Sequence, residues 1–154
     1  MTIFKLPILD LKIESEFRKI FNKVLLAEKL SFEGFTIKLF PEDFNHICYE
    51  YKRGGIYKEK FSLRRARRLL LIKEICDGSI PYILIHQITR DNKSVCVLCE
   101  SAEFAMFLTP KTSDSGDYFR MGTIIAYGEK IESKIEKQKT NGNLIKKAKE
   151  VFNH

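Results

Sequence analysis

Hydrophobic positions near the start of the chain follow a helical period and then a strand period. Between residues 10 and 30 they recur every three or four positions, which predicts an amphipathic helix. The residues that form this apolar stripe are Ile13, Phe17, Ile20, Phe21, Val24 and Leu25. Gly34 is a stop signal for that helix, and the alternation in residues 35–40 predicts a short strand.

Two further helices are predicted before the middle of the chain. Pro41, followed by two acidic residues, favours the first turn of a short helix that carries His46. After a flexible loop at residues 52–57, Ser62 can cap a longer helix that runs to Asp77. That helix begins with a basic cluster, Arg64, Arg65, Arg67 and Arg68. Its second half is almost entirely apolar, so we expect that half to pack on a sheet and the arginine end to be exposed.

The pattern changes to strands after Gly78. Four strands are predicted, at residues 80–89, 95–100, 103–109 and 118–127. Their short connections favour an antiparallel meander, and the longest connection, 111–117, predicts a loop at the border of a site. The predicted fold class is therefore α+β, with N-terminal helices packed on a four-stranded antiparallel sheet and a basic helical C-terminal segment.

The length of 154 residues predicts a single domain. Within it we distinguish an N-terminal helix (1–34), a core (35–128) and a basic helical extension (129–154), which is either a solvated packing helix or an arm that grips phosphates. No apolar run reaches the roughly 20 residues of a membrane-spanning helix, so no membrane partner is expected and a cytoplasmic location is the default. The net charge of +7 favours acidic partners, nucleic acid first.

The cysteine spacing contains a candidate metal motif that its context argues against. Cys96 and Cys99 have the spacing of half a zinc site. However, the segment is β-branched and apolar, and residues three apart on a strand point to opposite faces. We therefore expect buried, reduced cysteines and no metal or other cofactor.

Arginine and histidine together suggest chemistry on a phosphodiester. A guanidinium presents donors in a fixed fork that fits phosphate oxygens, and a histidine transfers protons near neutral pH. His46 and the basic cluster supply both groups. The candidate RNA-binding or phosphate-binding residues are Arg65, Arg67, Lys60, Lys111 and Arg120.

The order of several short motifs resembles a known group of nucleases. The motifs are Phe44-Asn-His46-Ile, Lys60-Phe-Ser-Leu-Arg-Arg-Ala-Arg-Arg-Leu-Leu70, Ile80-Pro-Tyr-Ile and Thr123-Ile-Ile-Ala-Tyr127. Across roughly residues 35–128 they are similar to the phage-associated nucleases of the barnase, EndoU, colicin and RelE-like superfamily. The resemblance implies helices on a four-stranded antiparallel sheet and a metal-independent ribonuclease. It also implies a toxin or phage-defence effector that cleaves tRNA or mRNA to a 2′,3′-cyclic phosphate, with an acidic antitoxin or immunity protein as a possible partner.

The resemblance also suggests catalytic roles for particular residues: His46, Arg64, Arg68, Thr123 and Tyr127. His46 would be the base or the acid, Arg64, Arg65 or Arg68 would hold the scissile phosphate, and Thr123 with Tyr127 would bind phosphate or donate a proton.

Each role has a structural alternative. His46 can be a capping or core histidine, the arginines a solvated helix end, and the Thr123 strand a packing strand. His86, Glu100 and Glu103 are further candidates for a second proton-transfer group. Two other functions also fit the sequence: a non-catalytic nucleic-acid-binding module and a protein-interaction domain.

Overall fold

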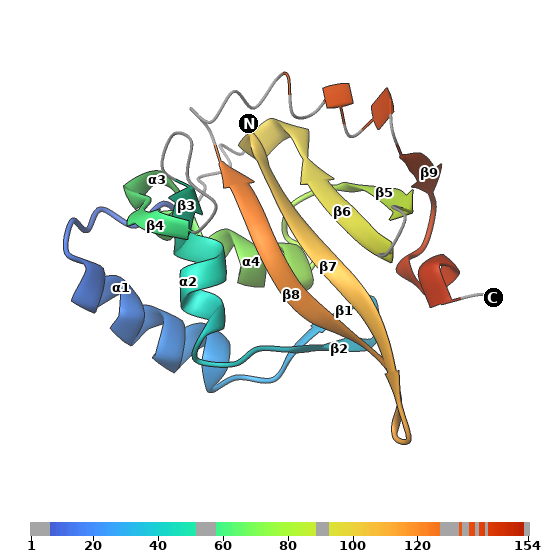
Figure 1. Cartoon of the computed structure of the whole chain (residues 1–154), viewed down its shortest axis with the longest axis horizontal. Coiled ribbons are helices and arrows are strands. Elements are labelled where there is room, and N and C mark those ends of the chain that lie inside the picture. The colour runs from blue at the N-terminus through green and yellow to red at the C-terminus, as the bar shows by residue number, and fades with distance from the viewer. Residues whose placement is uncertain are drawn as a thin grey trace.

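A seven-stranded mixed sheet runs through the molecule, with helices packed along one side (Figure 1). The computed structural model describes residues 7–51, 58–88, 93–126 and 142–152, together with positions 133, 136, 137, 139 and 140. The strand order is β1-β2-β8-β7-β6-β5-β9. A separate two-stranded sheet pairs β3 (Tyr49–Tyr51) with β4 (Lys58–Phe61).

The centre of the large sheet is the antiparallel meander that the hydrophobic pattern predicts. It consists of β5 (Ile83–Ile88), β6 (Lys93–Cys99), β7 (Phe104–Ser113) and β8 (Gly116–Ala126). Pairing of β7 with β8 continues to Ser113 and Gly116. Residues 111–117 therefore form the end of a tight hairpin, and the prediction of a longer loop there is wrong.

The predicted four-stranded antiparallel sheet is also wrong, because three more strands extend the meander into a mixed sheet. They are β1 (Leu30–Phe32), β2 (Phe35–Lys38) and β9 (Asn143–Ile145). β2 runs parallel to β8 and pairs with it at Ile37 and Lys38 only. The short strand predicted at residues 35–40 is confirmed as β2. β1 and β9, with three residues each, are too short for alternation to show in the sequence, and the parallel contact of β2 depends on segments that are distant in the chain.

Four α-helices lie beside the meander: α1 (Glu14–Ile20), α2 (Asp43–Cys48), α3 (Leu63–Ala66) and α4 (Leu69–Cys76). α1 continues as a π-helix at Phe21–Leu26, so the predicted N-terminal helix ends earlier than residue 34. Ser62 caps α3 as expected, with its Oγ accepting from the Arg65 backbone N–H at 3.3 Å. The predicted long arginine helix is interrupted at Arg67 and Arg68, which separate α3 from α4.

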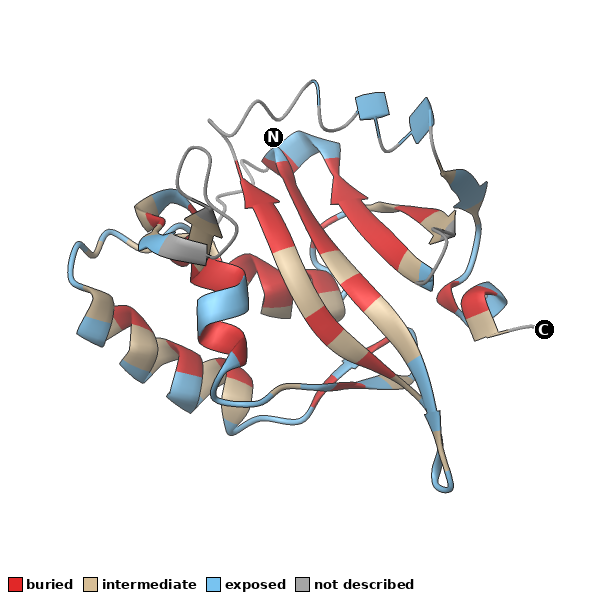
Figure 2. Cartoon of the chain, viewed as in Figure 1, coloured by how far each residue is buried: buried red, intermediate tan, exposed pale blue. Residues whose placement is uncertain are grey.

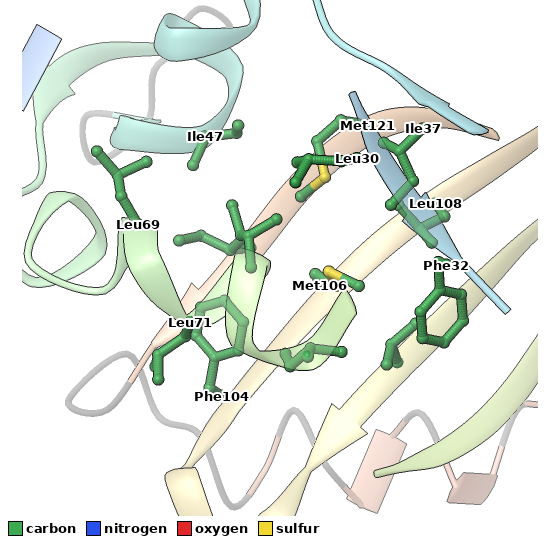
Figure 3. Close-up of a cluster of buried hydrophobic side chains, with 14 of the residues drawn as sticks. Leu30, Phe32, Ile37, Ile47, Leu69, Leu71, Phe104, Met106, Leu108 and Met121 are labelled. Atoms are coloured by element: carbon green, nitrogen blue, oxygen red, sulfur yellow. The ribbon is translucent and has the colours of Figure 1, made fainter. Parts of the chain in front are cut away.

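The main core fills the space between these helices and one face of the sheet. Figure 3 shows part of it, where α4 meets the strands through Leu69, Leu71, Phe104 and Met106. A smaller cluster lies on the opposite sheet face and consists of Ile85, Cys96, Leu98, Ala105 and Ile125. Figure 2 shows that most of β6 is buried, whereas buried and half-buried residues alternate along β7 and β8.

The C-terminal segment is more than the basic helical extension that the sequence predicts. Its described residues between 133 and 140 are helical, but Asn143–Ile145 pairs with β5, and a 3-10 helix follows at Ala148–Phe152. Glu33 connects the C-terminal segment to the rest of the protein. Its carboxylate accepts hydrogen bonds from Ala148 N at 2.8 Å and from the Tyr82 hydroxyl at 2.6 Å. Among the described helices none is long and apolar enough to cross a membrane.

Candidate functional site

A pocket of about 670 Å³ lies where β8, α2 and the start of α3 meet. Its polar lining consists of Asp43, His46, Arg65, Arg120 and Thr123. Phe107 and Ile125 contribute apolar surface, and both belong to the smaller cluster or pack against it. Residues that the sequence picks out from three separate segments thus meet in one pocket: His46, Arg65, and Arg120 with Thr123.

A β-bulge in β8 turns two of these side chains toward the pocket. Met106 pairs with Ile124 and Leu108 with Met121, so Gly122 and Thr123 together lie opposite Phe107. In a regular strand, residues 120 and 123 would point to opposite faces. The extra residue restores a common face, and bulges often re-aim side chains in this way.

Gly122 makes the bulge possible. A Cβ atom at this position would lie 2.9 Å from the Phe107 carbonyl oxygen, which is closer than real contacts allow. The two strands therefore approach each other more closely than any residue with a side chain would permit.

α2 lies along the edge of β8 beyond its short contact with β2 (Figure 1). The link is polar: Thr123 Oγ1 donates to the His46 carbonyl at 3.0 Å. The helix thereby covers a strand edge whose backbone groups are not paired with another of the described strands. The hydrogen bond also fixes the position of His46 relative to the sheet.

Arg65 is an anchored cation at the back of this arrangement. Its side chain is almost fully buried, with the residue 7% exposed. Nη1 donates to the Tyr49 carbonyl at 3.0 Å and to Thr123 Oγ1 at 3.3 Å. These contacts join α3, β3 and β8, so the guanidinium is held in place before any ligand binds.

Arg120 is held from two sides and keeps one unsatisfied donor. Nη2 donates to Asp43 Oδ1 at 3.3 Å, and the guanidinium carbon lies 4.2 Å from the centre of the Phe40 ring. Asp43 is completely buried, and its other oxygen accepts from Phe40 N at 2.7 Å. Arg120 Nη1 is buried and has no hydrogen-bond partner among the residues that the structure describes.

His46 projects from the middle of α2 and is exposed at the pocket wall. It lies three residues after Asp43, so the two share one face of the helix. The opposite side of α2, with Phe44, Ile47 and Cys48, is buried in the main core. The packing of that side orients His46 toward the pocket, and the alternative that His46 is a core residue does not hold.

The remaining predicted basic residues lie elsewhere. Lys60 and Arg64 line a separate, smaller depression of about 270 Å³. Arg67 Nε donates to the Leu11 carbonyl, and Arg68 Nη1 donates to the Arg64 carbonyl. Lys111 is on the exposed β7–β8 hairpin. Tyr127 lies outside the described residues.

The other candidates for a second proton-transfer group do not line the pocket. His86 is on β5, where it pairs with Val95 and Asn143. Glu100 forms an ion pair with Lys139 at 2.8 Å, and Glu103 occupies a turn with positive φ before β7. None of the three is among the described residues that surround the pocket.

Sequence reasoning missed two residues that shape the site. Asp43 was assigned only to a helix start, although its spacing from His46 places both on one helical face. Gly122 interrupts a strand that is otherwise rich in large residues, and an isolated glycine in a strand indicates a bulge or a close backbone approach. In the sequence, Gly122 is therefore the signal that indicates the bulge and, through it, the pocket.

The cysteines lie apart from this chemistry. Cys96 belongs to the smaller cluster and Cys99 to the main core, so they point to opposite sheet faces as predicted. Burial raises the pKa of both thiols to about 12, which disfavours the thiolate that binds metals. Within the described part of the chain, no three His, Cys, Asp or Glu side chains are grouped as metal ligands.

Comparison with known proteins gives no match, whether with family models, curated proteins or solved structures. The functional argument therefore rests on the pocket. It holds two guanidinium groups, and Asp43 is the only carboxylate among its described lining residues. An excess of fixed positive charge beside a histidine suits an anionic substrate.

Proposed function

We propose that the protein is an endoribonuclease that cleaves RNA without a metal ion. The observation that carries this proposal is the buried Nη1 of Arg120, which has no partner among the described residues and belongs to a side chain that lines the pocket. An unsatisfied buried donor is costly, and an anionic oxygen would satisfy it with a strong, charge-assisted hydrogen bond. The scissile phosphate of RNA supplies such an oxygen.

Arg65 and Arg120 would stabilise the charge that develops on phosphorus. Both guanidinium groups are fixed by partners in the folded protein, Arg65 by Tyr49 and Thr123 and Arg120 by Asp43. Donors that are positioned before the reaction need no reorganisation in the transition state, which makes them effective catalysts. In this proposal the two arginines, rather than the larger basic cluster, bind the reacting phosphate.

His46 would transfer one of the two protons that the reaction moves. A base removes the proton of the 2′-hydroxyl, and the resulting oxygen attacks phosphorus. The bond to the 5′-oxygen breaks as an acid protonates that oxygen, which leaves a 2′,3′-cyclic phosphate and a 5′-hydroxyl. Imidazole serves either role near neutral pH. Thr123 is best placed to position His46, because its hydroxyl is bonded to the His46 carbonyl. Tyr127 stays the candidate for the second proton-transfer group.

The biological role that we propose is a toxin or phage-defence effector acting on tRNA or mRNA. Its support is the motif order in the sequence and the net charge of +7, which also suits an acidic antitoxin or immunity protein.

The test is incubation of labelled total RNA with purified protein in EDTA, followed by analysis of fragment ends. We expect cyclic-phosphate ends from the wild type and a loss of about a hundredfold or more for His46→Ala, in line with general acid–base catalysis. Glu42→Ala is the control, because Glu42 is exposed beside the same helix and lies outside the pocket lining.

Intact RNA in every sample would overturn the proposal. If the RNA were bound in a salt-sensitive way but not cut, the protein would be a binding module. That alternative is favoured by one observation: Asp43 and Thr123 are engaged in internal hydrogen bonds, whereas cleavage needs two groups that transfer protons. Equal cleavage by the wild type and His46→Ala would assign the chemistry to another residue or to a contaminant.

A further inference from the structure

The hairpin of β7 and β8 extends well beyond the rest of the meander. β6 pairs with β7 only as far as Leu108, whereas β7 and β8 stay paired to their tip. Figure 1 shows this hairpin projecting from the body of the molecule, and Figure 2 shows that its end is exposed. It begins at the pocket, because Arg120 is one of its residues.

The two faces of the hairpin differ in chemistry. Directly paired residues share a face, so Lys111 and Tyr118 form one pair and lie on the same side as Arg120, two residues further along β8. Thr112 and Asp117 form the next pair on the opposite side, where their side chains are hydrogen-bonded at 2.8 Å. The pocket side therefore carries cations and an aromatic ring, and the other side carries an acid.

Lys38 adds a second lysine to the pocket side. It pairs with Arg120 across the short parallel contact, and its Nζ lies 4.0 Å from the centre of the Tyr118 ring. Lys38 and Lys111 are exposed, and Tyr118 is half-buried. Two lysines thus flank one aromatic ring on a surface that continues from Arg120.

We propose that this surface, the hairpin track of Lys38, Lys111 and Tyr118, binds the single-stranded RNA that continues from the scissile phosphate. The inference rests on the proposed function and extends it to the form of the substrate. Because Lys38 Nζ covers one face of the Tyr118 ring, a base stacks on the other face, and the lysines contact the phosphates on either side of it. Tyr118 is two residues from Arg120, roughly 7 Å along the strand, so the track begins immediately beside the reacting phosphate.

A single strand fits this surface better than a duplex does. Stacking on a protein ring requires a base that has left its own stack, which single-stranded RNA provides and a helix does not. One ring between cations is also sequence-tolerant, because every base has a face that stacks. The track therefore selects for strandedness and not for a particular base.

The test measures binding with a fluorescent, fully 2′-O-methylated RNA, which cannot be cleaved. Two such RNAs are compared. One is a dinucleotide, which fills only the pocket, and the other is a longer single strand that also covers the hairpin. We expect Tyr118→Ala to weaken binding of the long strand about fivefold to a hundredfold, the range found for lost base stacking, with less than about a twofold change for the dinucleotide. Lys111→Ala should reduce the slope of log K against log salt concentration for the long strand by about one, because one fewer counterion is released on binding.

Lys19→Ala is the matched control. It removes one positive charge, as Lys111→Ala does, but at an exposed residue of α1 away from the hairpin, so it should leave binding of both RNAs nearly unchanged. Equal effects of Lys111→Ala and Lys19→Ala would mean that Lys111 acts only through net charge and would overturn the proposal. So would unchanged long-strand binding by Lys111→Ala, a variant at an exposed position that avoids any folding defect of Tyr118→Ala.

Failure of the track and failure of the ribonuclease proposal have different signatures. The first case is cleavage in EDTA that depends on His46, together with long-strand binding that does not change when Tyr118 or Lys111 is replaced. This result would reject the track but not the ribonuclease proposal. Binding that depends on both residues without any cleavage would reject the catalytic function and keep a single-strand binding surface.

Discussion

Two buried nitrogen atoms in the described part of the chain lack a hydrogen-bond partner, and their surroundings differ. Arg120 Nη1 belongs to a side chain that lines the pocket, and it shares that pocket with Arg65 and His46. His86 Nε2 lies on β5, where it pairs across the sheet with Val95 and Asn143 and where Lys93 and Glu150 are the charged groups that affect it.

The two groups differ in how each can avoid the free-energy cost of being buried without a hydrogen-bond partner. A guanidinium cannot lose its charge in a protein, so Arg120 needs an external acceptor. An imidazole can become neutral: burial, helped by Lys93 and opposed by Glu150, lowers the pKa of His86. An unsatisfied arginine donor therefore needs an acceptor from outside the described residues, a water or a ligand oxygen, whereas an unsatisfied histidine nitrogen indicates a pH-dependent contribution to stability.

Among the changes that test this comparison, the largest effect is expected from replacing the geometry of Arg120 while keeping its charge. Arg120→Lys retains a cation for Asp43 but loses the fork that includes Nη1, so we expect RNA cleavage to fall about tenfold to a hundredfold. Arg64→Lys makes the same chemical change at an exposed residue outside the pocket and should cost less than about twofold. Equal losses in kcat/KM would show that the pocket arginine has no special position.

Gly122→Ala tests the bulge that brings Arg120 and Thr123 to one face. The new Cβ would meet the Phe107 carbonyl at 2.9 Å. We expect a loss of about 1–3 kcal/mol in the free energy of unfolding, the usual cost of overpacking, together with reduced cleavage. Urea denaturation measures the first effect. A variant as stable and as active as the wild type would mean that the strands separate without consequence for the pocket.

Thr123→Val examines the link between α2 and β8. It removes the hydroxyl that donates to the His46 carbonyl and accepts from Arg65, at nearly constant volume. We expect a loss of about 1–2 kcal/mol in stability and weaker cleavage. Thr123→Ser keeps the hydroxyl and should restore most of both. If Thr123→Val kept the stability and the cleavage of the wild type, the hydroxyl and its hydrogen bonds would have no role in the link.

The smallest effect concerns the other unsatisfied nitrogen. Because the pKa of His86 is lowered on folding from 6.5, the unfolded chain binds more protons just below that pH. The contribution of His86 to stability is therefore present above pH 6.5 and declines as the pH falls through the window below it. Urea midpoints of the wild type and His86→Asn across this range provide the measurement. Parallel pH dependence in the two proteins would exclude His86 as the cause.

Local patterns were sufficient for the elements that local interactions determine. The apolar period predicts the N-terminal helix, Ser62 predicts the start of α3, and alternation predicts the four strands of the meander. His46 lies on the short helix that Pro41 and the acidic residues indicate. In each case the residues that decide the structure lie within a few positions of one another.

The pocket depends on contacts that no local pattern contains. Of the four clustered arginines, Arg65 lines the pocket, where it donates a hydrogen bond to Thr123 of β8. Arg67 and Arg68 instead donate to the backbone carbonyls of Leu11 and Arg64. A helical wheel places Arg64, Arg67 and Arg68 on one side and leaves Arg65 apart, but it does not say which side meets a distant strand. The bulge in β8 places Arg120 on the same face as Thr123, which accepts a hydrogen bond from Arg65.

The two-residue contact between β2 and β8 also bears on how the sheet assembles. The meander forms from neighbouring segments, whereas β2 must find β8 from the opposite part of the chain and contributes only the Ile37 and Lys38 pairs there. Long-range pairing is slow because it must first close a long loop. We therefore expect the meander to form first and the β1–β2 edge to join late, so that in native-state hydrogen exchange this edge opens before β6 and β7 do.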